Sequence, residues 1–359
     1  MRVALVYDRV NKWGGAERIL LALHELFPDA PLYTSVYNPL HASWAKVFTV
    51  KTSFLQSLHV ARGSHEYFAL AMPLAFESFD FSNYDVVISI TSEAAKGILT
   101  PPRVKHISYC LTPTRYLWSG HDEYFRNPIV RFLAKPAVSY LRHWDTIAAN
   151  RPDFFIAISQ EVKGRIKKYY QKEASVIYPP LALPEGDTKR KKGKYFLVVS
   201  RMVPYKRIDL AIKACNQLEI PLKIVGTGGQ LSYLRKIAGP TVEFLGNLTD
   251  LELVEYYKGC QGLIFPGKED FGLTILEAQK YGKPVIAFKA GGALETVRQG
   301  KTGLFFYPQT MKALMYTMQR FMKKKFDPKL CKKQAAQFSK ERFKDEFLTA
   351  IGYIMNTNP

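Results

Sequence analysis

Short apolar runs alternate with segments of helical periodicity along most of the chain, and this alternation restricts the fold more than any single motif. The first run, RVALVYD (2–8), leads into a turn with two glycines and then into AERILLALHELF, whose apolar residues recur at helical spacing. Similar apolar runs follow at 84–90, 106–111 and 153–159. A strand, a glycine turn and a helix open a doubly wound sheet, so the sequence predicts an α/β fold.

A second strand–helix series begins at residue 195, after a stretch (177–194) that is rich in proline and then strongly basic. Such a composition is typical of an interdomain linker. The apolar runs of the second series are at 195–200, 222–229, 242–247, 262–267, 284–292 and 303–307. We expect one domain over residues 1–180, a second over 181–340 with a cleft between them, and a C-terminal helix over 341–359 that crosses back to the first domain.

The chain is unusually basic, with 51 Lys and Arg against 31 Asp and Glu and a formal net charge of +20. This excess indicates an anionic partner: a nucleic acid, an anionic lipid or a phosphorylated substrate. Basic residues cluster at 163–172, 189–194 and 322–333, where solvated helix faces and a linker account for many of them. No RNP-like string or other binding motif supports nucleic acid, whereas an anionic membrane surface fits the charge.

The cysteines and the N-terminus bear on metal binding and location. The four cysteines form no CxxC pair, so we expect no metal site and a reducing compartment. The opening MRVALVYDRV is too short an apolar run for a signal peptide, and no stretch approaches the ~20 residues of a membrane span. The expected location is the cytoplasm, with the inner face of the cell membrane as a surface for peripheral attachment.

The segment FPGKEDFGLTILEAQKYGKPV (265–285) contains two competing patterns. Asp270, Phe271 and Gly272 match the metal-binding triplet of protein kinases, but the chain has no His-Arg-Asp and no glycine-rich lid before a strand lysine. The kinase interpretation therefore fails. The second pattern is a pair of glutamates, Glu269 and Glu277, eight positions apart.

Thr274 is a suitable N-cap for a helix in which Glu277 would be the third residue, with Glu269 on the preceding loop. The amides of Gly272 to Ile275 would then leave a helix N-terminus, which attracts anions, while carboxylates accept hydrogen bonds from hydroxyls. This combination suits a ligand with both phosphates and hydroxyls. The alternative is that Glu277 only completes a capping box with Thr274, and the local pattern does not separate the two.

A basic counterpart lies in SRMVPYKRIDLAIKA (200–214). Arg201 and Lys206 follow the end of a predicted strand, and carboxyl ends of strands form the ligand crevice of open α/β sheets. Two cations there could neutralise a diphosphate. The alternative is a solvated loop.

These segments, together with GGAER, TPTRYLWS and NRPDFFIAISQEVKGRI, resemble glycosyltransferase family 4. The family is a retaining group with two Rossmann-like domains, the GT-B fold. The resemblance covers essentially the whole chain, and it is greatest to bacterial mannosyltransferase-like members that build surface polysaccharides. The basic SRMVPYK motif followed by the two glutamates is its most specific part.

The resemblance implies a role for each matching residue. Arg201 and Lys206 would hold the donor diphosphate, and Glu269 would hydrogen-bond the donor sugar. Glu277 would bind the ribose hydroxyls. The remaining donor-binding positions are Phe271, Gly272, Leu273 and Thr274 near the phosphates, Gly246, Asn247 and Leu248 along the base, and Gly14 and Gly15 in the other domain. For Gly14 and Gly15 a plain tight turn is the alternative.

The resemblance also implies the reaction: transfer from a GDP-mannose-like or UDP-hexose donor, with no metal and no other cofactor, to a lipid-linked or saccharide acceptor. In this family the acceptor hydroxyl attacks the donor sugar on the same face that the diphosphate leaves from. A phosphate oxygen of the leaving group assists in deprotonating the acceptor. No DxD-like carboxylate pair appears in the loops that would form the cleft. Two alternatives remain, a catalytically silent basic GT-B binding protein and a GT-B sugar-nucleotide epimerase. Nothing in the sequence indicates the oligomeric state.

One position departs from the family pattern. Many relatives carry a histidine just before the Thr-Pro of YCLTPTRY, where it contacts the donor near its 6-hydroxyl, and this chain has Leu111. His106 and His121 are out of register with it. Either the site is silent, or the donor lacks a 6-hydroxyl, as a 6-deoxyhexose or a pentose does.

Overall fold

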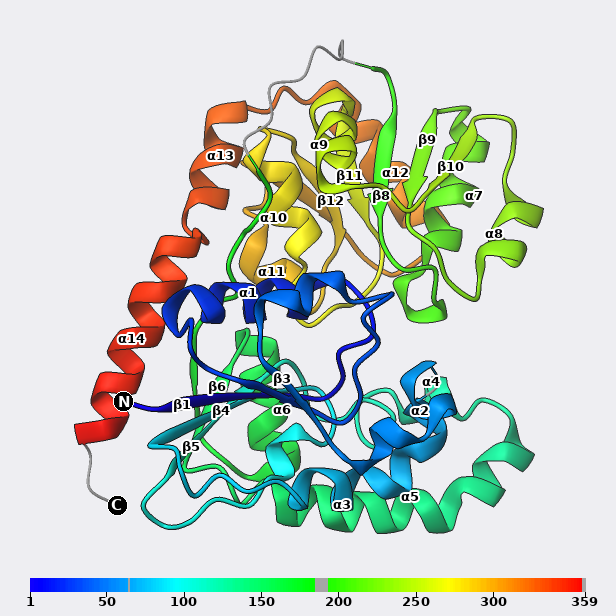
Figure 1. Cartoon of the computed structure of the whole chain (residues 1–359). Coiled ribbons are helices and arrows are strands. Elements are labelled where there is room, and N and C mark those ends of the chain that lie inside the picture. The colour runs from blue at the N-terminus through cyan, green and yellow to red at the C-terminus, as the bar shows by residue number, and fades with distance from the viewer. Residues whose placement is uncertain (64, 185–192, 357–359) are drawn as a thin grey trace. The chain divides into compact units, whose positions relative to one another are not determined.

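The computed structural model describes residues 1–63, 65–184 and 193–356 (Figure 1). The chain divides into two compact units, Met1–Pro180 with Phe343–Pro359, and Leu181–Arg342. We call them unit 1 and unit 2. Residues 185–192 of the predicted linker lie outside the described residues. Each unit contains a parallel sheet with helices, which confirms the expected α/β class.

Unit 1 contains a seven-stranded parallel sheet in the order β3-β2-β1-β4-β5-β6-β7. Its strands are β1 (Val3–Tyr7), β2 (Leu32–Thr34), β3 (Val50–Thr52), β4 (Val86–Thr91), β5 (Lys105–Cys110), β6 (Phe154–Ala157) and β7 (Ala174–Val176). The four strands expected from the apolar runs are β1, β4, β5 and β6. The three shorter ones, β2, β3 and β7, have only three residues each and were not predicted.

The α-helices of unit 1 are α1 (Gly15–Leu26), α2 (His59–Gly63), α3 (Met72–Glu77), α4 (His121–Tyr124), α5 (Pro128–Ala148) and α6 (Gln160–Tyr170). Short 3-10 helices lie at η1 (Ser43–Val47), η2 (Phe54–Ser57), η3 (His65–Ala71) and η4 (Ala95–Gly97).

The last helix, α14 (Lys340–Asn356), contributes residues from Phe343 onward to unit 1. Its Phe343, Phe347, Ile351 and Ile354 recur at helical spacing and are buried. The rings of Phe343 and Phe347 lie 6.0 Å and 5.8 Å from the ring of Tyr109 on β5. The chain therefore returns to the sheet of its N-terminal half at its end.

Unit 2 contains six parallel strands in the order β10-β9-β8-β11-β12-β13. They are β8 (Phe196–Val199), β9 (Leu222–Val225), β10 (Val242–Gly246), β11 (Gly262–Phe265), β12 (Val285–Phe288) and β13 (Gly303–Phe306). The helices are α7 (Ile208–Leu218), α8 (Leu231–Ile237), α9 (Asp250–Gly259), α10 (Leu273–Lys280), α11 (Ala293–Thr296), α12 (Met311–Lys323) and α13 (Pro328–Ala336), with η5 at Pro204–Lys206.

Both faces of the unit 2 sheet are apolar. Phe196 and Ile264 belong to one buried core cluster, while their strand neighbours Leu197 and Leu263 belong to another. Successive residues of a strand point to opposite faces, so continuous apolar runs provide a core on each side. This explains why the strands of unit 2 could be recognised as short uninterrupted apolar segments.

Each sheet changes its direction of winding at one place. In unit 1 the strand order reverses between β1 and β4, and in unit 2 it reverses between β8 and β11. Connections leave toward opposite sides at such a point, which opens a crevice at the carboxyl ends of the two central strands. The polar residues that follow β1, β4, β8 and β11 are therefore the first candidates for function.

We expect the stability of unit 1 to depend on pH through His106 on β5. Burial, and to a smaller extent the charge of Arg151, lowers the pKa of His106 from 6.5 to about 3. Below pH ~6.5 the imidazole of His106 is protonated in the unfolded chain but stays neutral in the folded protein. The free energy of unfolding therefore falls as the pH decreases toward 3, by up to about 1.4 kcal/mol per pH unit.

Urea unfolding of the wild type and of His106→Gln between pH 7 and pH 4 measures this contribution. The variant should show the shallower dependence, even if its stability at pH 7 is lower, because glutamine does not titrate. Equal slopes for the two proteins would contradict the assignment.

Candidate active site

The loops that follow β8 and β11 meet at the switch point of unit 2. Gly267, just after β11, has no room for a side chain, because a Cβ there would lie 2.8 Å from the carbonyl oxygen of Tyr205 and 2.9 Å from the Cα of Lys206. A glycine at this position allows the backbones of the two loops to touch. The contact brings Lys206 of one loop next to Glu269 of the other.

Lys206 and Glu269 form an ion pair between the Nζ and Oε2 atoms. Lys206 is 9% exposed, and the side chain of Glu269 is 20% exposed. Lys206 Nζ also lies 5.2 Å from the centre of the Tyr205 ring. A nearly buried ammonium beside a shielded carboxylate interacts with ligands more strongly than a solvated lysine does, because water screens it less.

Arg201 shares this loop but is exposed, and its Nη2 donates a hydrogen bond of 3.3 Å to the hydroxyl of Tyr205. The loop therefore carries two cations on either side of one tyrosine. The alternative of a merely solvated loop describes Arg201 but not Lys206.

The start of α10 differs from the expectation. The N-cap is Gly272, with a φ of 94°, and its first helical residue is Leu273, so Thr274 is the second residue of the helix and not its cap. The positive φ suits glycine, which has no Cβ to clash. A Cβ at Gly272 would also lie 3.1 Å from the Phe265 ring. The prediction of Thr274 as N-cap is wrong.

The capping box is wrong for the same reason. Glu277 is the fifth residue of α10, not the third, and it is buried. Its Oε2 accepts a hydrogen bond of 2.7 Å from the hydroxyl of Tyr257. Glu277 therefore points to a buried partner on α9 and does not cap the helix.

A third loop, which follows β12, contacts the backbone of Glu269. The amide of Gly292 donates a hydrogen bond of 2.9 Å to the carbonyl oxygen of Glu269. Gly291 has a φ of 62°, and Cβ atoms built at Gly291 and Gly292 would collide with the backbones of Glu269 and Phe271 respectively. This glycine pair after β12 was not recognised in the sequence, although a GG following an apolar run is the signal that could have revealed it.

Phe271 is buried, and its ring lies 5.6 Å from the ring of Phe338. The Asp-Phe-Gly triplet therefore anchors and turns the loop. The triplet directly follows Glu269 in the chain and leads into the first turn of α10, whose N-cap Gly272 makes no side-chain capping hydrogen bond.

The predicted base-lining residues lie at the same edge of the sheet, where β10 ends: Gly246 is its last residue, and Asn247 and Leu248 follow it. Gly246 has a φ of 69° and accepts a hydrogen bond of 2.8 Å from the amide of Gly226, which follows β9. Asn247 is exposed and contacts the hydroxyl of Thr227 at 3.3 Å, while Leu248 packs against one of the core clusters. Arg201, Lys206, Gly246–Leu248, Glu269 and the start of α10 thus all follow carboxyl ends of strands in one sheet.

Gly14 and Gly15 lie in unit 1, where α1 begins. Gly14 is the N-cap of α1 with an extended backbone, and a Cβ there would lie 3.1 Å from Oε2 of Glu17. Glu17 is buried and accepts a hydrogen bond of 2.7 Å from the hydroxyl of Tyr7. Burial and then the charge of Glu17 raise the pKa of Tyr7, which keeps this donor protonated. The close approach explains a small residue at position 14.

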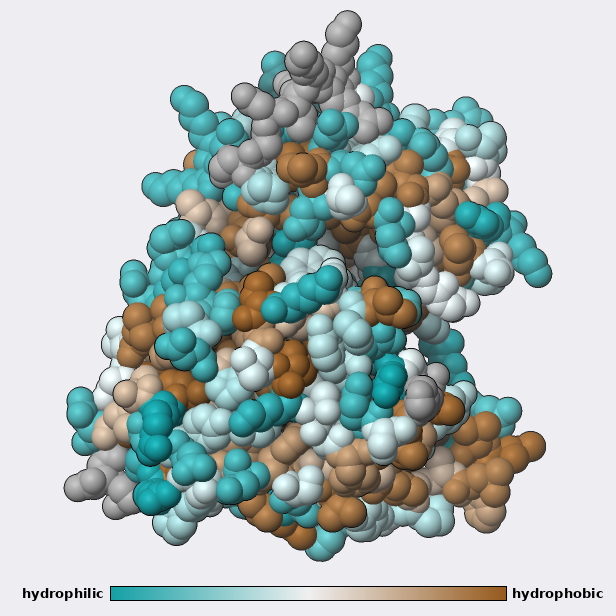
Figure 2. Space-filling view, viewed as in Figure 1, coloured by the Kyte–Doolittle hydropathy of each residue, from teal (hydrophilic) through white to brown (hydrophobic). Residues whose placement is uncertain are grey.

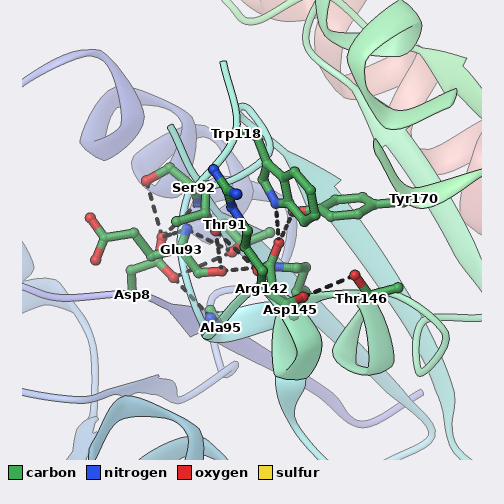
Figure 3. A network of polar contacts seen from close by, with 12 residues as sticks. Asp8, Thr91, Ser92, Glu93, Ala95, Trp118, Arg142, Asp145, Thr146 and Tyr170 are labelled. Carbon is green, nitrogen blue, oxygen red and sulfur yellow. Dashed lines mark hydrogen bonds and ion pairs between the residues drawn. The ribbon is translucent and has the colours of Figure 1, made fainter. Parts of the chain in front are cut away.

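The switch point of unit 1 contains a polar network that was not predicted (Figure 3). Asp8, directly after β1, points at the loop that follows β4. Its carboxylate accepts from the amides of Ser92 at 2.6 Å, Glu93 at 3.0 Å and Ala95 at 2.8 Å, and from the hydroxyl of Thr91 at 3.3 Å. One buried carboxylate thereby fixes the conformation of this loop. Its position directly after the first strand was the available signal.

The loop also carries Lys96, which is buried and pairs with Asp145 of α5 at 2.5 Å. Asp145 further accepts from Trp118 at 2.7 Å, Tyr170 at 2.8 Å and Thr114 at 3.1 Å. These donors compensate the desolvation that makes most buried ion pairs costly. Because both charges are so deeply buried, the pair is a structural anchor.

Arg9 and Glu93 form a more accessible pair at the same switch point, with 2.6 Å between Nη1 and Oε1. Burial alone would lower the pKa of Arg9, but the neighbouring carboxylate outweighs it and raises the pKa, so Arg9 stays charged. Leu111 follows β5 at this edge, is half-buried, and its amide donates to the carbonyl of Thr91 at 2.8 Å. These residues are the candidates for ligand contacts in unit 1.

Parts of the chain are similar in sequence to known proteins. Residues 182–341 match the family described as Glycosyl transferases group 1. D-rhamnosyltransferase WbpZ of Pseudomonas aeruginosa is 27% identical over 217 residues, 55% of each chain. A GDP-mannose-dependent monoacylated alpha-(1-6)-phosphatidylinositol monomannoside mannosyltransferase of Corynebacterium glutamicum is 37% identical over 121 residues, 29% of this chain and 32% of the relative.

The chain spans about half the length of the first curated relatives that it matches. Among solved structures, HepE of Anabaena in complex with UDP has a TM-score of 0.71 at 20% identity, over 98% of this chain and 100% of that one. This likeness along the whole chain confirms the GT-B fold class. The family match covers nearly all of unit 2, so this unit is similar in sequence to the group 1 glycosyl transferases.

Proposed function

We propose that this protein transfers a glycosyl group from a nucleoside diphosphate sugar to a hydroxyl of a lipid-linked or saccharide acceptor. The observation that carries the proposal is the pairing of Lys206 with Glu269 at the switch point of unit 2, beside the N-terminal turn of α10. A cation and the amides of a helix N-terminus suit a diphosphate, and a carboxylate suits the hydroxyls of a sugar.

In the proposed reaction the bond between C1 of the sugar and the diphosphate oxygen breaks, and a bond from the acceptor oxygen to C1 forms. Negative charge develops on the leaving diphosphate, which Lys206 and Arg201 would neutralise. Lys206 now pairs with Glu269, so a bound diphosphate would compete for the ammonium and release the carboxylate toward the sugar. Fixed charges of this kind are usually the largest contribution to such catalysis.

We further propose that the configuration at C1 is retained, as in glycosyltransferase family 4. The proton of the acceptor hydroxyl would pass to an oxygen of the departing diphosphate, so that no protein base is required. The cationic loop would supply the positive charge that a metal ion provides in other enzymes.

The similar proteins point to two different donor nucleotides. HepE was solved with UDP, and the Corynebacterium enzyme is named for GDP-mannose. Thermal shift of the purified chain with UDP-, GDP- and dTDP-sugars separates them, because a ligand that binds only the folded state raises stability with its concentration. Release of nucleoside diphosphate distinguishes a transferase from a silent binding protein, and an epimerised sugar with the nucleotide still attached identifies an epimerase.

Leu111 is relevant to which donor sugar the protein uses. The resemblance places position 111 near the 6-position of the donor, where a leucine offers no hydrogen bond to a hydroxyl. One relative is a D-rhamnosyltransferase, and rhamnose is a 6-deoxyhexose. We propose on this basis that the donor sugar lacks a 6-hydroxyl, which would replace a polar contact with an apolar one.

Lys206→Ala is expected to lower kcat/KM about 10²- to 10³-fold, the usual cost of removing one charge-stabilising group. Arg201→Ala should weaken turnover in the same direction. Lys213→Ala is the matched control, because Lys213 is a lysine on α7 of the same unit with a side chain 44% exposed. Nucleoside diphosphate release measures all three, and near-normal turnover of Lys206→Ala with the preferred donor would refute the site.

Metal removal tests the charge assignment. Turnover should be unchanged, within about twofold, after dialysis against EDTA, because Lys206 and Arg201 would supply the positive charge at the diphosphate. The measurement is nucleoside diphosphate release before and after addition of Mg²⁺ or Mn²⁺. Loss of activity on dialysis and its recovery with either ion would contradict metal independence.

Leu111→His is expected to shift the donor preference toward hexoses with a 6-hydroxyl by about fivefold, since one added hydrogen bond contributes roughly 1 kcal/mol. The ratio of kcat/KM for GDP-mannose to that for GDP-rhamnose, compared between wild type and variant, measures the shift. Leu111→Met is the control, because it keeps the apolar character. A wild type that uses only 6-hydroxyl hexoses would remove the hypothesis.

A further inference from the structure

A hydrogen bond inside unit 2 joins the helices α9 and α10, which lie side by side (Figure 1). The hydroxyl of Tyr257 on α9 donates to Oε2 of Glu277 on α10 at 2.7 Å. Tyr257 is completely buried, whereas Glu277 is 6% exposed. A residue without exposed surface can reach Glu277 only from the interior of the unit. The small exposed part of Glu277 is therefore what a ligand could touch.

The ring of Tyr257 is held in place by its packing. It stacks on the ring of Tyr281, with 6.0 Å between the ring centres and 21° between the planes. Tyr281 is fixed in turn, because its hydroxyl donates to the carbonyl oxygen of Pro184 at 2.6 Å. Both tyrosines belong to one buried core cluster, together with Val254 one turn earlier on α9. The hydroxyl of Tyr257 therefore has a well-defined position.

A donor on one oxygen restricts the whole carboxylate of Glu277. The last torsion angle of a glutamate side chain is broadly distributed, so nothing in the side chain itself fixes where its two oxygens point. Hydrogen bonds to an ionised acceptor are roughly twice as strong as those between neutral groups. The bond from Tyr257 to Oε2 therefore also sets the direction of the second oxygen, Oε1.

The positions of the two helices in the chain relate Glu277 to both ends of a nucleotide. Helix α9 begins directly after Gly246–Leu248, the residues predicted to lie along the base. Helix α10 begins shortly after Glu269, which pairs with Lys206 where the diphosphate would bind. In a nucleoside diphosphate the ribose joins the base to the diphosphate. A carboxylate on one of these helices and bonded to the other is therefore suited to accept hydrogen bonds from ribose hydroxyls.

We propose that Tyr257 is a positioning residue of the donor site. Its hydroxyl holds Oε2 of Glu277, so that the carboxylate meets the ribose hydroxyls in a fixed orientation and the protein selects ribonucleotides over deoxyribonucleotides. The inference rests on the proposed function only in that the donor is a nucleotide. Of UDP-, GDP- and dTDP-sugars it favours the first two, because the deoxyribose of dTDP lacks the 2′-hydroxyl.

Isothermal titration calorimetry of the full chain tests the proposal. UDP and GDP are titrated first, and the tighter binder is then compared with its 2′-deoxy and 3′-deoxy forms. The wild type should bind at least one deoxy form about tenfold more weakly, because a hydroxyl that donates to a carboxylate is missing. In Tyr257→Phe this ratio of dissociation constants should fall at least about threefold, because the ring and its packing remain while the donor to Glu277 is removed.

A second variant shows whether Tyr257 acts through the carboxylate. Glu277→Gln should lower the same ratio, and Tyr257→Phe combined with Glu277→Gln should lower it no further than Glu277→Gln alone. Residues in one hydrogen-bonded unit have effects that do not add. Additive effects of the two substitutions would overturn the positioning role.

Tyr195→Phe is the matched control. The hydroxyl of Tyr195 donates to the carbonyl oxygen of Tyr256 on α9 at 2.9 Å, so this variant also removes a hydrogen bond from a buried tyrosine to α9. Tyr257→Phe and Tyr195→Phe should both lower Tm, but the ratio in Tyr195→Phe should stay within about twofold of the wild type. An equal fall of the ratio in the control would overturn the proposal, because lost stability would then explain both.

The outcomes for Tyr257 and for the transferase can be separated. Equal binding of the ribonucleotide and both deoxy forms, tighter binding of dTDP than of UDP and GDP, or no binding of any of them would overturn the inference. Nucleoside diphosphate release from a sugar donor in the same protein would leave the proposed transferase standing. Conversely, a wild type that prefers the ribonucleotide but releases no nucleoside diphosphate would contradict the transferase and leave the inference standing.

Discussion

The contact between the loops after β8 and β11 is the constraint on which the candidate site depends. Gly267 allows the two backbones to touch, and the touching backbones bring Lys206 and Glu269 into an ion pair with little exposure to water. Gly291 and Gly292, in the loop after β12, pack closely against the backbones of Glu269 and Phe271. The charges of the site are therefore positioned by glycines, whose missing side chains set how closely three loops can pack.

In unit 1 the loops at the switch point are held in place by buried charges rather than by close-packed glycines. At its switch point the carboxylate of Asp8 receives amides and hydroxyls of the loop after β4, and Lys96 ties that loop to Asp145 on α5. Buried charges with several donors each give a loop one conformation, because every alternative would leave a charge unpaired. Arg9 and Glu93 form a second ion pair at this switch point, and their side chains are 12% and 23% exposed.

Helix α5 has one face packed into unit 1, where Asp145 belongs to this network, and another face exposed to solvent. Its inner face supplies Asp145, Val138 and Leu141 to unit 1, and its first turns carry the exposed apolar residues Ile129, Phe132 and Leu133 (Figure 2). No helix in the described ranges is long and apolar enough to cross a bilayer. A net charge of +20 spread over a whole chain says little about where a partner binds.

The sequence by itself determined the class of fold, because apolar runs buried on both faces of a parallel sheet are local patterns. It also predicted Arg201, Lys206 and Glu269 as site residues, and the structure brings Lys206 and Glu269 into contact. The sequence misplaced the start of α10 at Thr274 and did not reveal Asp8 or the pair Gly291–Gly292. Only the tertiary structure decided these features. The cap at Gly272 follows from a positive φ and close packing against Phe265, and the importance of Asp8 follows from amides more than eighty residues away in sequence. Contacts of that kind depend on which strands are neighbours, and strand order has no local signature in a chain.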